Sequence, residues 1–171
     1  MEAIDWALLV LRVGLGGIFL AHGIKHLGSR EKTTNWFESL GFRSPGFQWL
    51  AMTATEIGAG ALLVLGLLNG LASAAVIGTM LVAFITVHRP AGFFITAFMK
   101  EGTDVEGYEY VLTLAVMAVA LAIAGPGQIS LDDSMGMADA MDAGVGALLV
   151  AGGLIFGFVQ VATFWRPDRT T

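Results

Sequence analysis

The chain contains no cysteine and few charged residues, and both absences narrow what it can be. Without cysteine it can form no disulfide, no thiolate metal site and no iron–sulfur cluster of its own. Charged residues make up 13% of its 171 residues and hydrophobic residues 56%, whereas ordinary soluble domains have about 25% charged residues. Such a chain cannot cover its apolar surface with polar side chains. Any redox chemistry must come from a partner or a bound cofactor.

A basic patch is missing as well. The net charge is -5 and the lysines and arginines form no cluster in the sequence, so nucleic acid is not expected as a partner. The acidic N-terminus differs from the basic start of a cleavable signal peptide, and we expect the first apolar stretch to be retained in the membrane.

What the chain has instead is a series of long apolar stretches. Each approaches the roughly 20 residues that a helix needs to cross about 30 Å of hydrocarbon, although the third and fourth are a little short. The predicted fold is therefore all-α, a polytopic transmembrane helical bundle. We expect its spans at residues 4–27, 49–68, 71–87, 108–124 and 143–164.

Two of the connections are informative. Residues 28–48 include Trp36, Phe37 and Leu40 about one helical turn apart, which predicts an amphipathic segment lying in the bilayer interface. Asn69-Gly70 is a strong turn signal between the second and third spans. These two spans should therefore form an antiparallel hairpin with almost no loop.

The distribution of positive charge predicts the orientation. Lysine and arginine accumulate in the short cytoplasmic loops of membrane proteins. Five spans place the N-terminus, the second connection and the loop 125–142 on one face, and these segments contain no lysine or arginine. We expect a plasma-membrane protein with its N-terminus outside and its C-terminus in the cytoplasm. The basic residues predicted on the cytoplasmic face are Arg30, Lys32, Arg43, Arg89, Lys100, Arg166 and Arg169.

Several ionisable residues lie inside or at the ends of the apolar stretches. A charge in hydrocarbon is costly, so such residues usually face the protein interior and mark a functional site. The predicted topology brings all of them except Arg12 to the cytoplasmic half of the bundle. The full set is Arg12, His22, Lys25, Glu56, His88 and Glu109.

Glu56 carries the most information of this set, because a carboxylate at that depth needs either a raised pKa or a cation beside it. Lys25 is the nearest cation that the predicted topology allows. This pair can be a buried ion pair that fixes helix register, or Glu56 can be a protonatable or ligand-binding group. Arg12 can snorkel outward or pair with Asp132.

His22 and His88 also allow two interpretations. Near an interface each can simply bind water or a backbone carbonyl, or they can relay protons and hold a quinone carbonyl together with Glu109. No pair of these residues has a spacing that is diagnostic of a metal site, so no metal is expected.

Pairs of small residues recur one turn apart, which lets helices approach closely in lipid. We expect most of them to pack within the chain, and a pair in the last span can alternatively form a homo-oligomer interface. These pairs are Ala74/Gly78, Ala118/Ala122 and Gly153/Gly157.

A set of motifs stands in a characteristic order along the chain: Leu11-Arg12, Phe19, His22-Gly23 and Lys25; Glu56, Gly60 and Leu65-Gly66-Leu67; His88; Glu109; Gly125-Pro126-Gly127 and Ser130-Leu131-Asp132. In these residues the chain resembles the DoxX family of small bacterial and archaeal membrane proteins. The resemblance covers about residues 5–132 and implies a four-helix transmembrane domain over 1–132. Residues 133–171 depart from the family pattern and add an acidic loop, a fifth C-terminal transmembrane helix and a short cytoplasmic tail.

The resemblance also implies a link to redox metabolism, since relatives include the small membrane subunits of thiosulfate:quinone oxidoreductase. Our leading hypothesis is a membrane subunit of a quinone-linked oxidoreductase or redox-defence complex. Its quinone would lie between His22, His88, Glu56 and Glu109, and a soluble or membrane redox partner would supply electrons. The alternatives are a proton-coupled transporter for a small solute, and a non-catalytic scaffold for soluble redox enzymes.

Overall fold

The computed structural model describes residues 1–102, 104–140 and 142–167, and its regular elements are all helical. This confirms the predicted fold class. The α-helices are α1 (Ala3–Leu27), α2 (Arg30–Ser39), α3 (Pro45–Leu65), α4 (Asn69–Ala83), α5 (Glu109–Ala124), α6 (Leu131–Ser134) and α7 (Ala143–Phe164). A π-helical turn at Phe84–His88 and a 3-10 turn at Arg89–Ala91 continue α4, and further 3-10 turns lie at Ile95–Met99 and Ala138–Ala140.

Four of these helices are long and apolar enough to cross a membrane. They are α1, α3, α7 and the continuous helical run Asn69–Ala91 that begins with α4. The third span is therefore longer than predicted, because the π-helical and 3-10 turns extend it. The remaining apolar helix, α5, has 16 residues and is roughly 24 Å long at 1.5 Å per residue.

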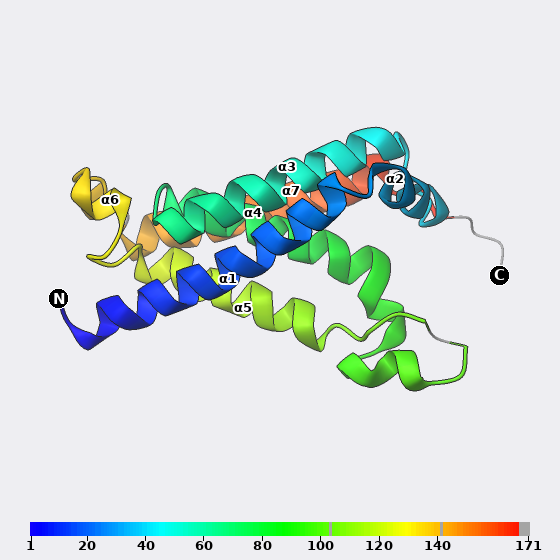
Figure 1. Cartoon of the computed structure of the whole chain (residues 1–171), viewed down its shortest axis with the longest axis horizontal. Coiled ribbons are helices and arrows are strands. Elements are labelled where there is room, and N and C mark those ends of the chain that lie inside the picture. Colours follow the sequence, from blue (N-terminus) through cyan, green and yellow to red (C-terminus); the bar gives the residue numbers. More distant parts are fainter. Residues whose placement is uncertain (103, 141, 168–171) are drawn as a thin grey trace.

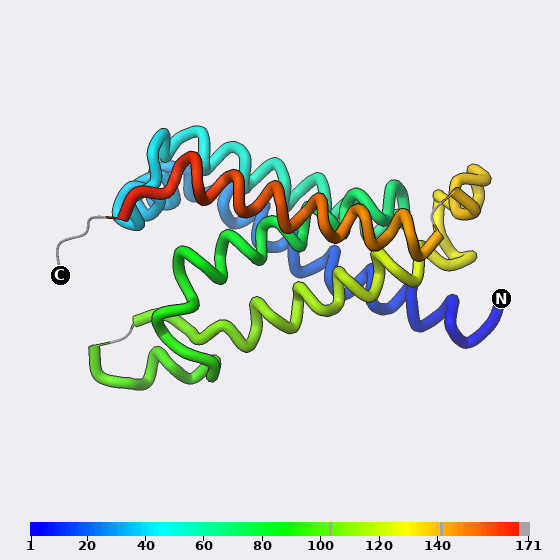
Figure 2. The backbone as a smooth tube through the Cα atoms, turned by 180° about the vertical axis from the view of Figure 1, so that it is seen from behind, coloured from blue at the N-terminus to red at the C-terminus, as the bar shows by residue number. Residues whose placement is uncertain are grey.

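The helices form an elongated bundle with two distinct ends (Figures 1 and 2). The N-terminus, the α3–α4 turn and α6 lie at one end. At the other end, which we call the basic end, lie α2, the α4–α5 connection and the last turn of α7. Every described lysine and arginine except Arg12 lies at or near the basic end; Arg169 is outside the described residues.

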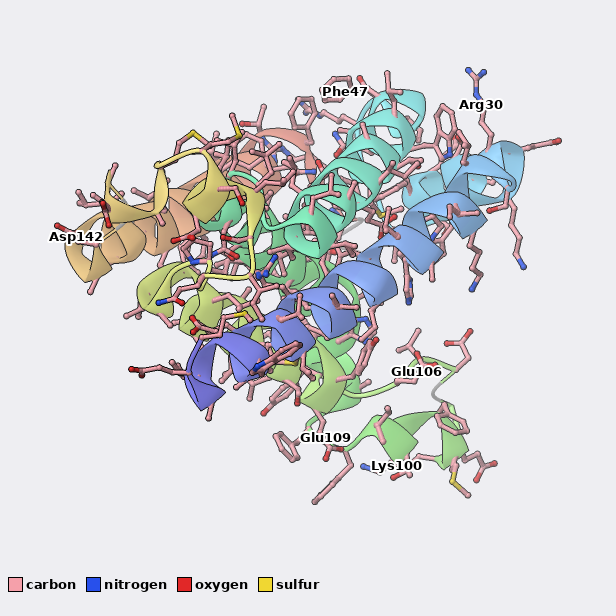
Figure 3. All side chains as sticks on the ribbon, turned by 60° about the vertical axis from the view of Figure 1, so that its left-hand side comes forward. Arg30, Phe47, Lys100, Glu106, Glu109 and Asp142 are labelled. Atoms are coloured by element: carbon pink, nitrogen blue, oxygen red, sulfur yellow. The ribbon has the colours of Figure 1, made fainter. Side chains whose placement is uncertain are left out.

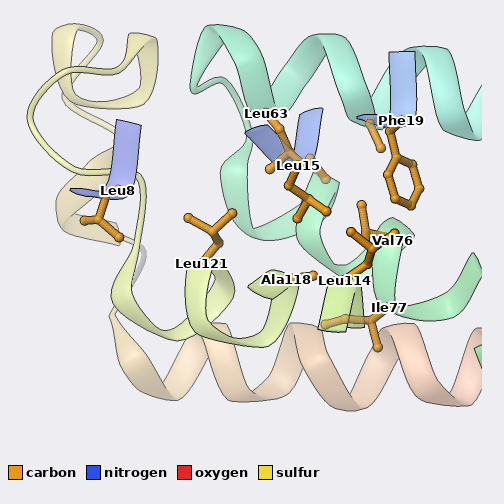
Figure 4. Packing of buried hydrophobic residues seen from close by; sticks show 11 residues of the cluster. Leu8, Leu15, Phe19, Leu63, Val76, Ile77, Leu114, Ala118 and Leu121 are labelled. Atoms are coloured by element: carbon orange, nitrogen blue, oxygen red, sulfur yellow. The ribbon is translucent and has the colours of Figure 1, made fainter. Parts of the chain in front are cut away.

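Glycine lets the helices approach backbone to backbone. A Cβ atom on Gly16 of α1 would lie 2.7 Å from the carbonyl oxygen of Gly60 on α3. A Cβ atom on Gly153 of α7 would clash with the carbonyl oxygen of Ala74 on α4. The small residues of the last span therefore pack within the chain. Between these close approaches lies an apolar core (Figure 4) that includes Leu15, Leu63, Val76, Ala118 and Leu121.

The predicted turn at Asn69-Gly70 is wrong in position. The chain turns at Gly66 and Leu68, which have positive φ values of 66° and 49°. Asn69 is already the first residue of α4 and is fully buried. The reason is a cap from a distant segment: the carboxylate of Asp132 accepts hydrogen bonds from the backbone N–H groups of Leu68 (2.8 Å) and Asn69 (2.9 Å).

Candidate functional site

Glu56 pairs with a histidine at the crossing of α1 and α3. Its Oε2 atom lies 2.8 Å from Nδ1 of His26. Glu56 is 6% exposed, and the indole N–H of Trp49 donates to the His26 backbone carbonyl at 2.9 Å. A buried carboxylate on a membrane helix is thus matched by a titratable partner instead of a permanent cation.

Lys25, the cation that we expected beside Glu56, is exposed and faces elsewhere. Successive residues of a helix point about 100° apart, so only one of the neighbours Lys25 and His26 can face α3. His26 shares its face with Phe19 and Gly23, which are both buried. This spacing of three and four residues is a signal in the sequence that identifies His26.

His22 extends the pair toward the surface. Its side chain is exposed, and its ring meets the His26 ring edge-on with 6.2 Å between centroids. We call His22, His26 and Glu56 the His26 cluster. Gly23 allows α1 to approach α3 closely at this cluster, because a Cβ atom there would lie 2.6 Å from Cγ1 of Ile57 and 3.1 Å from Cβ of Glu56.

His88 and Glu109 have a different set of partners, in the connection between α4 and α5. Nδ1 of His88 lies 2.8 Å from the carbonyl oxygen of Glu106, and Oε2 of Glu109 accepts from the backbone N–H of Ile95 at 3.1 Å. In Figure 3, Glu106 and Glu109 lie together on this connection, apart from Arg30 on α2. The five residues that we expected around one cavity therefore do not share one. His22 contacts Glu56 only through His26, and His88 and Glu109 hydrogen-bond to backbone groups of the α4–α5 connection.

The hydrogen bond of His88 fixes its tautomer. A carbonyl oxygen only accepts, so Nδ1 of His88 carries the hydrogen in this contact. The Nε2 atom then remains available to accept a hydrogen bond from a ligand when the ring is neutral, or to donate one when the ring is protonated.

Arg12 is completely buried near the N-terminal end and points inward, so it does not snorkel. Its guanidinium donates to the backbone carbonyls of Leu63 (3.1 Å) and Ile129. Asp132, its expected partner, is also buried but uses its carboxylate oxygens to cap α4. No salt bridge within 4.0 Å joins these two described residues. Arg12 and Asp132 act together as a structural tie between α1, the α3–α4 turn and α6.

A pocket of about 640 Å³ lies between α3 and α7, with α4 as its floor. α2 covers it at the basic end. Most of its lining is apolar. It is lined by Trp36 and Phe37 of α2, by Phe47, Ala51, Met52 and Thr55 of α3, by residues of α4 and its continuation from Leu71 to His88, and by residues of α7 from Leu149 to Phe164.

The basic end of this pocket is closed by backbone contacts between α7 and the α2–α3 turn. The N–H of Arg43 donates to Phe164, and the N–H of Arg166 donates to Gly41, each at 2.8 Å. The indole N–H of Trp165 donates to the carbonyl of Leu40 at 2.8 Å. The last helix is therefore one wall of the pocket, and we call these contacts the α7 clasp.

Few polar groups reach the pocket. Of the site residues predicted from the sequence, His88 alone is part of the lining. Gln160 of α7 also lines it and donates from Nε2 to Oε1 of Gln48 on α3 at 2.9 Å. Thr79 and Thr86 donate to carbonyls of their own helix. Sequence reasoning missed both glutamines, since each is a single amide in an apolar stretch with no spacing to mark it.

Within the described residues, no three histidine, aspartate or glutamate side chains lie close enough together to hold a metal ion. Two arrangements are candidates for a functional site: the His26 cluster, which brings three ionisable side chains together, and the apolar pocket with His88 at one end.

Comparison with known proteins agrees with the motif pattern. The DoxX family profile matches residues 7–89. A protein of Bacillus subtilis (strain 168), named "Putative oxidoreductase CatD", is 31% identical over 124 residues, which cover 72% of this chain and 83% of CatD. No solved structure matches the chain. With this identity over most of both chains, the protein belongs to the DoxX family.

Proposed function

We propose that this protein is a membrane subunit of an oxidoreductase system and that the pocket between α3 and α7 binds a quinone-like molecule. The observation that carries the proposal is the combination of an elongated apolar pocket with a single histidine at its polar end. The name of the relative CatD supports the link to redox chemistry. An electron-donating partner is part of the proposal, because a chain without cysteine supplies no thiol or iron–sulfur centre.

The shape of the pocket suits a molecule with a polar head and a hydrocarbon tail. Leu71 and His88 both line it and lie 17 residues apart, which corresponds to roughly 25 Å along a helix. Phe47, Leu71 and Phe156 line the pocket and are also more than half exposed. The pocket is therefore open along the flank of the bundle, and a lipid-soluble molecule would enter from the bilayer.

His88 would hold the head group. With Nδ1–H donated to the Glu106 carbonyl, the Nε2 atom accepts a hydrogen bond from a hydroxyl when the ring is neutral and donates one to a carbonyl oxygen when the ring is protonated. A bound quinone would supply the electron-accepting chemistry, and its reduction consumes protons that a histidine within hydrogen-bond reach can deliver. Because His88 lies next to the α4–α5 connection, we expect it near the aqueous boundary of the bundle.

The proposed orientation follows from charge. We place the basic end in the cytoplasm and the N-terminus outside, in the plasma membrane, because the described lysines and arginines other than Arg12 gather at the basic end. The partner that supplies electrons would then approach from the cytoplasm, over α2 and the α4–α5 connection.

The His26 cluster favours a second candidate, proton-coupled transport of a small solute. A buried glutamate paired with a histidine, and a second histidine exposed beside it, form a chain of titratable groups at the α1–α3 crossing. Proton flux in liposomes that depends on Glu56 and is unaffected by His88→Leu would support this candidate over the quinone subunit.

The test of the leading proposal is the quinone content of protein purified in native lipid. Wild-type protein should carry quinone, and His88→Leu should carry clearly less, because it removes the polar contact and keeps the apolar wall. His22→Leu is the matched control, since His22 is exposed and does not line the pocket. Wild-type protein without quinone, or equal quinone in both leucine variants, would contradict the proposal.

A further inference from the structure

The pocket between α3 and α7 continues toward the N-terminal end of the bundle, and we propose that this continuation binds the tail of a long-chain polyprenyl quinone. The inference rests on the proposed function, because the tail belongs to the molecule whose head group lies at His88. It narrows the ligand class to quinones whose tail extends past the middle of the bilayer.

The continuation is a second cavity, of about 220 Å³, between α3 and α4. Thr55, Leu71 and Ala75 line both this cavity and the larger pocket. Because three wall residues are shared, the two spaces adjoin. We call the smaller cavity and the adjoining part of the pocket the tail groove; it is lined by Gly58, Leu62, Leu71, Ala75, Leu149 and Gly152.

Two glycines leave space in this groove. A Cβ atom on Gly58 of α3 or on Gly152 of α7 would have no atom within 4 Å, and both residues are exposed. The next residue, Gly153, instead packs directly on the backbone of α4. Neighbouring glycines of α7 therefore have different effects: Gly153 brings the helix onto α4, and Gly152 leaves the groove beside it open.

The two ends of the space differ in their side chains. The end near His88 is lined by the aromatic residues Trp36, Phe37, Phe47 and Phe164. Flat aromatic side chains suit a quinone ring, whereas the small side chains of the tail groove leave room for a chain with methyl branches. The α7 clasp closes the basic end, so a tail would run from His88 toward the N-terminal end.

The length of the space separates a quinone tail from a phospholipid chain. His88 and Leu71 are roughly 25 Å apart along the helix, whereas one leaflet contributes about 15 Å of a hydrocarbon core of about 30 Å. An acyl chain of a phospholipid at the basic end would stop short of Leu71, and a polyprenyl tail on a ring at His88 would reach it. A phospholipid of the opposite leaflet could reach the groove from the other end, so the test must separate these two occupants.

The experiment uses photoreactive probes on full-length protein in lipid nanodiscs, followed by mapping of the modified peptides. A polyprenyl quinone, a decyl quinone and a phospholipid each carry a diazirine at the far end of one chain. We expect the polyprenyl probe to label residues 58–62 of α3, 71–75 of α4 and 149–152 of α7, and unlabelled polyprenyl quinone to suppress this labelling. The shorter decyl probe should label positions nearer to His88.

Leucine at both glycines should close the tail groove. In Gly58→Leu/Gly152→Leu we expect labelling of the groove by the polyprenyl probe to fall roughly tenfold, the effect of overpacking a site. The decyl probe should lose far less labelling, because its tail is too short to fill the groove. Gly14→Leu/Gly17→Leu is the matched control and should resemble the wild type, since both glycines are exposed on α1, have no atom within 4 Å of a Cβ position and line neither cavity.

The outcomes separate this inference from the proposed function. Polyprenyl labelling that is confined to the residues near His88, or that persists undiminished in Gly58→Leu/Gly152→Leu, would overturn the tail groove and leave the quinone pocket standing. Labelling of the groove by the phospholipid probe that polyprenyl quinone does not suppress would assign the groove to lipid and overturn the inference. Wild-type protein that neither quinone probe labels would overturn the proposed function itself.

Discussion

At the scale of single residues, the buried side chains of Arg12 and Glu56 are satisfied by groups that lie far from them in the sequence. The cost of a charge in an apolar span singled out Arg12 and Glu56, and both are buried. Their partners depend on which side of a helix faces its neighbour and on contacts with distant segments. Thus His26 lies opposite Glu56 instead of Lys25, and Arg12 donates to the Leu63 and Ile129 carbonyls.

The same scale gives a prediction about the His26–Glu56 pair. His26→Leu leaves a buried carboxylate without a partner, and it should lower the free energy of unfolding by about 3 kcal/mol. The double variant His26→Leu/Glu56→Leu removes both polar groups and should recover most of this loss. Equilibrium unfolding in mixed micelles measures both values.

The neighbouring residue supplies the control. Lys25→Leu should leave the free energy of unfolding within about 0.5 kcal/mol of wild type, because Lys25 is exposed. A loss with Lys25→Leu as large as that with His26→Leu would mean that the lysine is the true partner of Glu56.

At the scale of elements, the order of the apolar spans could be predicted, whereas the bounds of the second and third spans were off by two to four residues at each end and the turn between α3 and α4 was misplaced. Residues 143–164 were predicted as a span and form α7 over the same range. The Asn69-Gly70 signal failed because Asp132, more than 60 residues away, caps α4 at Asn69. The pocket could not be predicted from the sequence either, because it depends on how α3 and α7 both pack on α4.

Packing of α1 on α3 gives a prediction at this scale. Gly16→Ala would place a Cβ atom 2.7 Å from a backbone oxygen of α3, whereas Gly17 has no atom within 4 Å of the equivalent position. We expect Gly16→Ala to destabilise the protein by about 1–3 kcal/mol, the range for overpacking a tight contact.

Gly17→Ala should be neutral or slightly stabilising, since alanine favours a helix over glycine by about 1 kcal/mol. Thermal unfolding of the two variants side by side provides the measurement. Equal melting temperatures would show that α1 and α3 do not approach each other as closely as described.

At the scale of the whole molecule, the basic end defines the proposed orientation, and the absence of cysteine makes that orientation easy to test. Single cysteines can be introduced without removing any native thiol. With the N-terminal end outside, Met135→Cys, which is exposed near α6, should react with an impermeant maleimide in intact cells.

Lys32→Cys in α2, also exposed, should react only after the membrane is permeabilised. The reverse pattern would place the basic end outside and move the proposed electron donor to the other side of the membrane.

The central claim at this scale is that the space between α3, α4 and α7 binds an amphipathic quinone. The most direct measurement is photo-crosslinking of a quinone analogue in native membranes, followed by mapping of the modified peptides. We predict adducts on residues 47–55 of α3, on residues 79–88 of α4 and its continuation, and on residues 156–164 of α7, and we expect unmodified quinone to suppress them. Adducts confined to α1 and α5, or adducts that unmodified quinone does not suppress, would contradict it.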